Sequence, residues 1–268
     1  TVMDCAKLLD VMAGFDAEDP ITARGVGNQP DSYASPLTAD GLKGKRLGIL
    51  RTVMGYHSEP DSDDFKQVDS VFNQAIADMH TAGAEIVDPL EIPNLNETLA
   101  KRAWDSLGDA EAFRAYCAGS ADAPFANMEE AMASPLYEQV CNGVTTRWAN
   151  KSTPEEYAAY QKARGDFMTQ VLAIMAENRL DAIVHKAVEH TPTPISDGTA
   201  PPWTDQKGAP HLNTFLIFVP SVVVPAGFTE SGLPAGVTFL GRPYSDGSML
   251  NLAYAYEQAT GHRKIPGF

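Results

Sequence analysis

The chain has 268 residues, of which 44% are hydrophobic and 21% charged, so it has the composition of a globular protein and the length of one large domain or two small ones. Its 35 acidic residues outnumber its 20 basic residues, and the net charge of −15 argues against proteins that hold nucleic acid or anionic membranes with clustered Lys and Arg. The longest apolar run, 215–228, is interrupted by Pro220 and Pro225 and is too short to span a bilayer.

The first ninety residues predict a strand–helix–strand unit. A capping-box-like start at 1–4 opens a first helix, and a loop rich in Asp, Pro, Gly and Ser follows over 15–44. A short apolar strand at 46–50, a helix with one apolar face over 65–79 and a second strand at 84–88 come next. Such a unit implies two parallel strands joined by a right-handed crossover.

The middle of the chain is predicted to be mostly helical. Residues 94–150 are rich in Ala, and Thr-Pro-Glu-Glu at 153–156 is a helix start with an N-cap, Pro at the first position and Glu at N3. That helix is expected to run to about residue 178, before a buried strand at 181–185. A loop with five prolines then reaches residue 212, and loops of this length are usually functional or disordered.

The C-terminal part predicts two more strands, at 221–224 and 235–240, and a last helix. Ser245 or Asp246 is expected to cap this helix, and Gly261 to end it. Because strands alternate with helices along the chain, we predict an α/β fold with a mixed, mostly parallel sheet and helices on both faces.

The cysteines bear on the cellular compartment. Cys5, Cys117 and Cys141 are odd in number and widely spaced, so they form neither a CxxC pair nor a disulfide framework. This pattern favours a reducing compartment, and we predict a cytoplasmic protein.

No complete active site emerges from these residues. The segment 185–190 contains two His and a Glu, but it has one residue too many for the HxxEH zinc pattern and follows a strand, so a strand-end loop is favoured. Cys117 and Cys141 have no neighbouring His and are expected to be buried small side chains. The chain has no G-x-S-x-G elbow and no phosphate-binding loop. We therefore expect no metal and no cofactor.

An ordered set of short motifs is more specific than any of these features. It comprises Asp4-Cys-Ala-Lys-Leu-Leu-Asp-Val-Met-Ala-Gly14, Pro220-Ser-Val-Val-Val-Pro-Ala-Gly227, Gly232-Leu-Pro-Ala-Gly-Val-Thr-Phe-Leu-Gly-Arg-Pro243 and the helix Leu252-Ala-Tyr-Ala-Tyr-Glu257. In this order the motifs resemble the amidase signature family. The resemblance covers essentially the whole chain and is strongest in the last fifty residues.

The resemblance implies that 1–268 is the C-terminal portion of a single amidase-like domain. In that family a Lys, a bridging Ser and a nucleophilic Ser cleave a carboxylic amide through an acyl-enzyme. Those residues belong to a Gly- and Ser-rich signature that precedes the equivalent of Thr1, and this chain has no Ser-Ser pair. We therefore assign no catalytic residue here and expect the chain alone to be inactive.

Two positions depart from the family pattern where the substrate pocket is expected. Phe215 and Phe218 stand where the family often has Asn and Gly, and the preceding loop adds Trp203. We predict that these three aromatic residues bind the acyl group of the substrate. Arg242, at the end of the last strand, is expected to anchor that end to a carboxylate.

Three functions stay open at this point. The first is an amidase that acts on a small-molecule amide together with the missing N-terminal half of the same protein, with a homo-oligomer also possible. The second is the A-type subunit of a glutamyl-tRNA amidotransferase, which shares the fold. The third is a catalytically inactive scaffold or binding protein.

Overall fold

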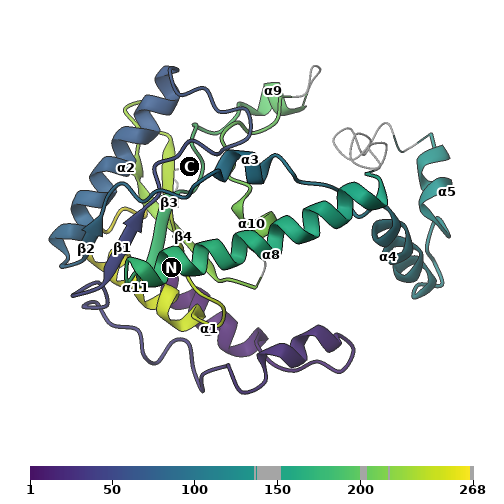
Figure 1. Cartoon of the computed structure of the whole chain (residues 1–268), viewed down its shortest axis with the longest axis horizontal. Coiled ribbons are helices and arrows are strands. Elements are labelled where there is room, and N and C mark those ends of the chain that lie inside the picture. Colours follow the sequence, from purple (N-terminus) through teal and green to yellow (C-terminus); the bar gives the residue numbers. More distant parts are fainter. Residues whose placement is uncertain (136, 138–151, 200–203, 217, 266–268) are drawn as a thin grey trace. The chain divides into compact units, whose positions relative to one another are not determined.

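The computed structural model describes residues 1–135, 137, 152–199, 204–216 and 218–265 (Figure 1). The chain divides into two compact units, one of Thr1–Leu95 with Met168–Phe268 and the other of Asn96–Phe167. None of the helices in these described ranges is both long and apolar enough to cross a bilayer.

The larger unit holds the sheet and the helices that cover it. Its elements in chain order are α1 (Val2–Met12), the 3₁₀ helix η1 (Pro20–Gly25), β1 (Arg46–Ile49), α2 (Asp63–Thr81), β2 (Glu85–Val87), β3 (Ala182–Lys186), α9 (Ile195–Thr199), α10 (Leu212–Phe215), β4 (Ser221–Phe228), β5 (Pro234–Leu240) and α11 (Asp246–Thr260).

The smaller unit is helical where it is described. It contains α4 (Ser106–Ala118) and α5 (Met128–Ala133), while α3 (Leu95–Leu99) and α8 (Pro154–Glu177) cross the boundary between the units. The helical start predicted at 153–156 is confirmed, because Thr153 Oγ1 accepts from the backbone N–H of Glu156 at 3.2 Å and the Glu156 carboxylate accepts from that of Thr153 at 2.8 Å. The predicted helical stretch 138–150 lies outside the described residues.

All five predicted strands belong to one mixed sheet, in the order β2-β1-β3-β5-β4. β1 pairs with β2 and with β3 in parallel, which confirms the predicted parallel crossover unit. β5 pairs with β3 and with β4 in the antiparallel sense, so two of the four strand pairs are parallel and two are antiparallel. β4 and β5 are antiparallel because a short turn joins them as a hairpin, and β5 lies between β4 and β3.

The main core lies between one face of the sheet and helices α2 and α11. Side chains alternate between the two faces of a strand, so every second residue of each strand enters this core. Burying one large apolar side chain stabilises a protein by about 1.5–3 kcal/mol, so a cluster of this size fixes the sheet against both helices. Its fully buried members include Leu47, Met79, Val184, Phe239 and Tyr256.

The opposite face of the sheet is covered by the segments that follow β2 and α8. A side chain at Gly48 would have its Cβ 2.6 Å from the Leu180 side chain and 2.9 Å from that of Leu90. The face therefore packs closely at this position of β1, and a larger residue would require the two leucine side chains to move. Helical and loop segments cover both faces of the sheet, as the alternating pattern predicts.

Buried polar groups attach the loop after β1 to the end of β3. The Glu189 carboxylate accepts from the backbone N–H of Met54 at 2.9 Å and from that of Gly55 at 3.0 Å, and it also accepts from the Ser58 hydroxyl. His190 Nε2 accepts from the backbone N–H of Glu59 at 2.9 Å. The pattern at 185–190 thus serves loop attachment, since its Glu and second His are engaged with backbone groups.

The helix ends agree with most of the sequence expectations. The capping box of Thr1 and Asp4 is confirmed, and α11 ends at Gly261, whose φ of 60° is left-handed. Ser245 does occupy the N-cap position of α11, but its hydroxyl donates to the Arg242 carbonyl at 2.7 Å and caps no N–H group.

The expected anchor between Arg242 and a carboxylate is wrong. Arg242 Nη1 donates to the backbone carbonyl of Leu180 at 2.8 Å, and no carboxylate among the described residues forms an ion pair with it. A main-chain oxygen just after α8 takes the place of the expected acid because β5 ends beside this turn. The arginine therefore keeps its positive charge uncompensated.

Candidate functional site

The three predicted substrate-binding aromatic residues have different surroundings. Phe215 closes α10 and is only 1% exposed, so it is a core residue. Phe218 is 52% exposed and lies at the edge of an open cleft. Trp203 lies outside the described residues. Of the two described aromatic residues, only Phe218 lines this cleft.

We call this cavity the Phe218 cleft. It has a volume of about 440 Å³, within the range of small-molecule sites. Four segments far apart in the sequence form it: the end of α1, the region of η1, the residues just before β4 and the start of α11. Its lining residues are Met12, Ala13, Gly14, Ile21, Thr22, Arg24, Gly25, Gln29, Phe218, Val219, Pro220, Tyr244 and Asp246.

Two aromatic residues of the cleft have an unusual backbone conformation. Phe218 has a φ of 67° and Tyr244 a φ of 61°, both in the left-handed region. Bulky residues rarely adopt it, and each such residue costs about 1–3 kcal/mol. Backbone strain of this kind is frequent at functional sites, although His57, Asn94 and Arg179 outside the cleft also have a positive φ.

The charges of the cleft come from one basic and one acidic residue. The Arg24 guanidinium lies 4.7 Å from the centre of the Phe218 ring, in a cation–π contact. No described carboxylate forms an ion pair with Arg24, and Asp246 enters from the first turn of α11. The cleft thus combines an aromatic surface with one cation and one anion, which suits a polar organic molecule with an apolar part.

The lining residues lack the groups that amide cleavage requires. They include no Ser, Cys, His or Lys, and Thr22 uses its hydroxyl to donate to the carbonyl of Asp19 at 2.7 Å. A nucleophile needs a neighbouring base and oxyanion donors. The residues of this cleft can therefore bind and orient a substrate, and they supply no acyl-transfer machinery of their own.

The most strongly perturbed histidine lies elsewhere, in β3. His185 is 5% exposed, and burial lowers its pKa from 6.5 to about 4, while a hydrogen bond to the Lys186 carbonyl at 2.7 Å partly offsets that effect. It is not among the residues of the Phe218 cleft. Within the described ranges no group of three His, Cys, Asp or Glu side chains is arranged to hold a metal ion.

Comparison with known proteins assigns the chain to a family. A model of the family described as Amidase matches residues 1–250, nearly the whole length. The chain belongs to the amidase signature family. Its curated relatives include a protein named "Probable amidase" in Arabidopsis thaliana, 29% identical over 285 residues that take in 100% of this chain and 48% of the plant protein.

The amidase signature family also contains components of larger enzymes. The A-type subunit of the glutamyl-tRNA(Gln) amidotransferase from Heliobacterium modesticaldum is 25% identical over 283 residues, which cover 99% of this chain and 54% of the bacterial protein. The chain therefore spans about half the length of the curated relatives it matches.

Solved structures of the family agree with the sheet and helices described above. The peptide amidase from Stenotrophomonas maltophilia matches with a TM-score of 0.72 at 27% identity, over 100% of this chain and 53% of that chain. An amidase family protein from Bacillus anthracis matches with a TM-score of 0.73 over 100% of this chain and 48% of that one, and its 22% identity shows the fold alone. The expected α/β amidase fold is confirmed.

Sequence reasoning missed two features of the Phe218 cleft. Arg24 stands in a stretch whose composition indicates only a loop, and its contact with Phe218 joins residues far apart in the sequence. Tyr244 follows a Gly-Arg-Pro turn. A left-handed backbone conformation is usually predicted from Gly or Asn, so the sequence gives no sign of it at a Tyr. The turn itself was the only available indication.

Proposed function

We propose that the chain is the C-terminal portion of a single-domain amide hydrolase whose catalytic Ser, bridging Ser and Lys lie upstream of Thr1. The match to the amidase family over residues 1–250, in a chain about half as long as its relatives, supports this most strongly. The absence of any nucleophile–base set among the lining residues of the Phe218 cleft agrees with it. On this proposal the chain alone is inactive and the protein is cytoplasmic.

In the complete enzyme the Phe218 cleft forms one wall of the substrate pocket. Phe218 gives an apolar surface for the acyl group, and its strained backbone holds the ring in the cleft. Phe215 is a core residue, so its part is to hold the segment that carries Phe218. Trp203 is the third aromatic residue of the proposed set.

The exposed apolar residues on and just after α1 indicate that another part of the same protein covers this surface. Val2 and Ala6 face the core, yet the other side of the helix and the residues after it expose Leu8, Val11, Met12 and Phe15, which are 59–83% accessible. Apolar patches of this kind mark interaction surfaces. In this proposal the upstream half of the protein covers it, and a second copy of the chain is the alternative occupant.

A second candidate is the A-type subunit of a glutamyl-tRNA amidotransferase. Proteins of that name match at 25–29% identity over nearly all of this chain, which is close to the identity of the plant amidase. An inactive scaffold with the amidase fold is the third. The coding sequence upstream of Thr1 separates the two enzymes from the scaffold: a Gly-Gly-Ser-Ser-like segment with an earlier Lys supports an enzyme, and its absence supports the scaffold.

Replacing Phe218 by Gly is expected to change the substrate preference of the complete enzyme. The ring removes volume from the pocket, so Phe218→Gly should raise kcat/KM for bulky acyl amides relative to small ones at least about tenfold. The measurement is a comparison of kcat/KM over a series of amides with growing acyl groups.

Phe218→Ala is the matched control, since it also removes the ring but keeps a side chain at the left-handed position. Both variants should shift the substrate ranking, while the Gly variant alone should gain stability from relieved backbone strain. If both variants fold and the ranking stays as in the wild type, Phe218 does not contact the acyl group.

A further inference from the structure

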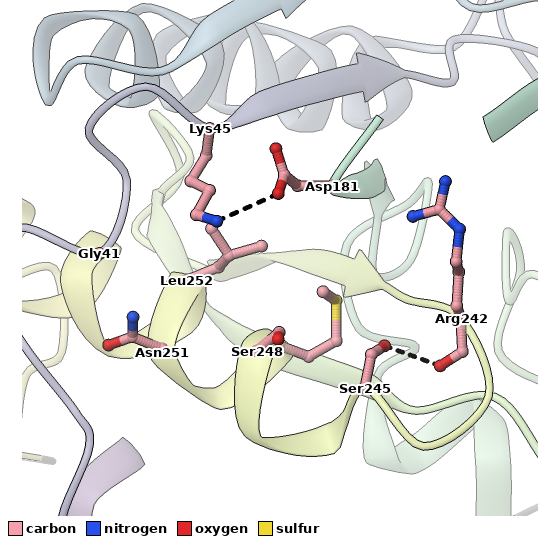
Figure 2. Close-up of a pocket in the computed structure, with 9 residues that line it drawn as sticks. Gly41, Lys45, Asp181, Arg242, Ser245, Ser248, Asn251 and Leu252 are labelled. Carbon is pink, nitrogen blue, oxygen red and sulfur yellow. Dashed lines mark hydrogen bonds and ion pairs between the residues drawn. The ribbon is translucent and has the colours of Figure 1, made fainter. Parts of the chain in front are cut away.

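A second cavity lies between α11 and residues next to the ends of β1, β3 and β5, and it shares no lining residue with the Phe218 cleft. We call it the Arg242 pocket (Figure 2). Its volume of about 180 Å³ equals the space of about six water molecules, which is enough for a small ion. It is lined by Gly41, Lys45, Asp181, Arg242, Ser245, Ser248, Met249, Asn251 and Leu252.

The single carboxylate of the Arg242 pocket is already engaged. One oxygen of Asp181 accepts from Lys45 Nζ at 3.1 Å, and the other accepts from the backbone N–H of Arg46 at 2.9 Å. Figure 2 shows the Lys45 and Asp181 side chains pointing toward one another above Leu252. Because Lys45 balances the charge of Asp181, the charge of Arg242 is left over, and the lining residues carry a net charge of +1.

The remaining hydrogen-bonding capacity of the pocket consists mainly of donors. Arg242 uses Nη1 for the Leu180 carbonyl, which leaves its other N–H groups without a described partner. Asn251 Oδ1 accepts from the backbone N–H of Thr38 at 2.8 Å, so its free group is the Nδ2 amide. The Ser248 hydroxyl, in the first turn of α11, also makes no hydrogen bond to the described residues.

We propose that the Arg242 pocket binds a small tetrahedral oxyanion of the phosphate or sulfate type. A guanidinium with free N–H groups forms strong, charge-assisted hydrogen bonds with such anions. Lys45 neutralises Asp181, so that carboxylate does not repel the anion, and Ser248 and Asn251 add neutral donors.

The test is thermal unfolding of the 268-residue chain in increasing sodium phosphate, with sodium chloride at matched ionic strength as the reference. Phosphate should raise Tm in a saturable manner, by about 2–5 °C at ten times its Kd, beyond the change in chloride. A sulfate series should behave similarly. If acetate raises Tm as much as phosphate does, the pocket binds carboxylates and the proposal is overturned.

Substitutions in the lining residues test whether phosphate binds in the Arg242 pocket. Lys45→Gln should abolish the phosphate-dependent rise, because it removes one cation and leaves Asp181 uncompensated. Lys43→Gln is the matched control, since Lys43 pairs with Asp40 on the surface and does not line the pocket. Ser248→Ala, which breaks no described hydrogen bond, should weaken phosphate binding several-fold without affecting folding.

Two results would overturn the proposal. One is an absence of any phosphate effect beyond that of chloride. The other is a phosphate effect of equal size in the wild type, Lys45→Gln and Ser248→Ala, which would mean that phosphate acts elsewhere or by general salt exclusion. If Lys45→Gln fails to fold, the Ser248→Ala titration decides.

Discussion

The free energy of unfolding is expected to fall by about 3 kcal/mol between pH 7 and pH 4 through His185 alone. This histidine is 5% exposed, and its burial lowers the pKa to about 4 in the folded chain against 6.5 in the unfolded chain. Between these two values the unfolded chain binds a proton that the folded chain excludes. The contribution of His185 to the free energy of unfolding is therefore present above pH 6.5 and is lost as the pH falls toward 4.

His185→Asn tests this expectation, because an amide keeps a donor toward the Lys186 carbonyl and cannot titrate. Urea unfolding from pH 4 to pH 7.5 should show that the difference in stability between wild type and variant changes by about 3 kcal/mol over this range. The control His80→Asn, at an exposed position of α2, should leave the wild-type pH dependence in place. Parallel curves for the wild type and His185→Asn would show that His185 titrates normally.

The largest expected effect is on catalysis. The chain of residues 1–268 should hydrolyse aryl and alkyl amides no faster than buffer does, whereas the protein extended by its upstream coding sequence should turn them over. The difference should be on the order of a million-fold, the size of the loss when the acting groups of a serine hydrolase are removed together. The measurement is release of ammonia or amine from a panel of amides under identical conditions.

One outcome would contradict this second prediction directly. Turnover by the 268-residue chain that a substitution within it abolishes, such as Cys117→Ala, would place a catalytic residue inside the chain. A contaminating amidase is recognised because its activity is independent of such a substitution.

The sheet could be predicted from the sequence because its strands are short apolar runs, most of them next to a glycine, a proline or a charged residue. The strand at 221–224 is longer in the structure, since β4 continues to Phe228 past Pro225, which an edge strand tolerates. The short helices η1, α9 and α10 were not predicted. They contain too few residues to show a helical period, and they lie in stretches whose Pro and Gly indicate loops.

The candidate site was less accessible to sequence reasoning than the fold. Phe215 and Phe218 are three positions apart, yet one is buried in the core and the other is half exposed, because α10 ends between them. The Phe218 cleft joins residues from both ends of the chain, such as Arg24 and Tyr244, and only the folded sheet brings them together. Likewise, the uncompensated charge of Arg242 appears only when its actual partner, the Leu180 carbonyl, is known.

The most direct test of the central claim is to locate the nucleophile with a serine-directed fluorophosphonate probe. The account predicts that the extended protein is labelled on one serine upstream of Thr1, that mass spectrometry of its peptides finds the adduct there, and that the 268-residue chain stays unlabelled. Active-site serines react because a base activates them, whereas ordinary serines do not. Stoichiometric labelling of any serine within residues 1–268 would contradict the claim that the catalytic residues lie outside this chain.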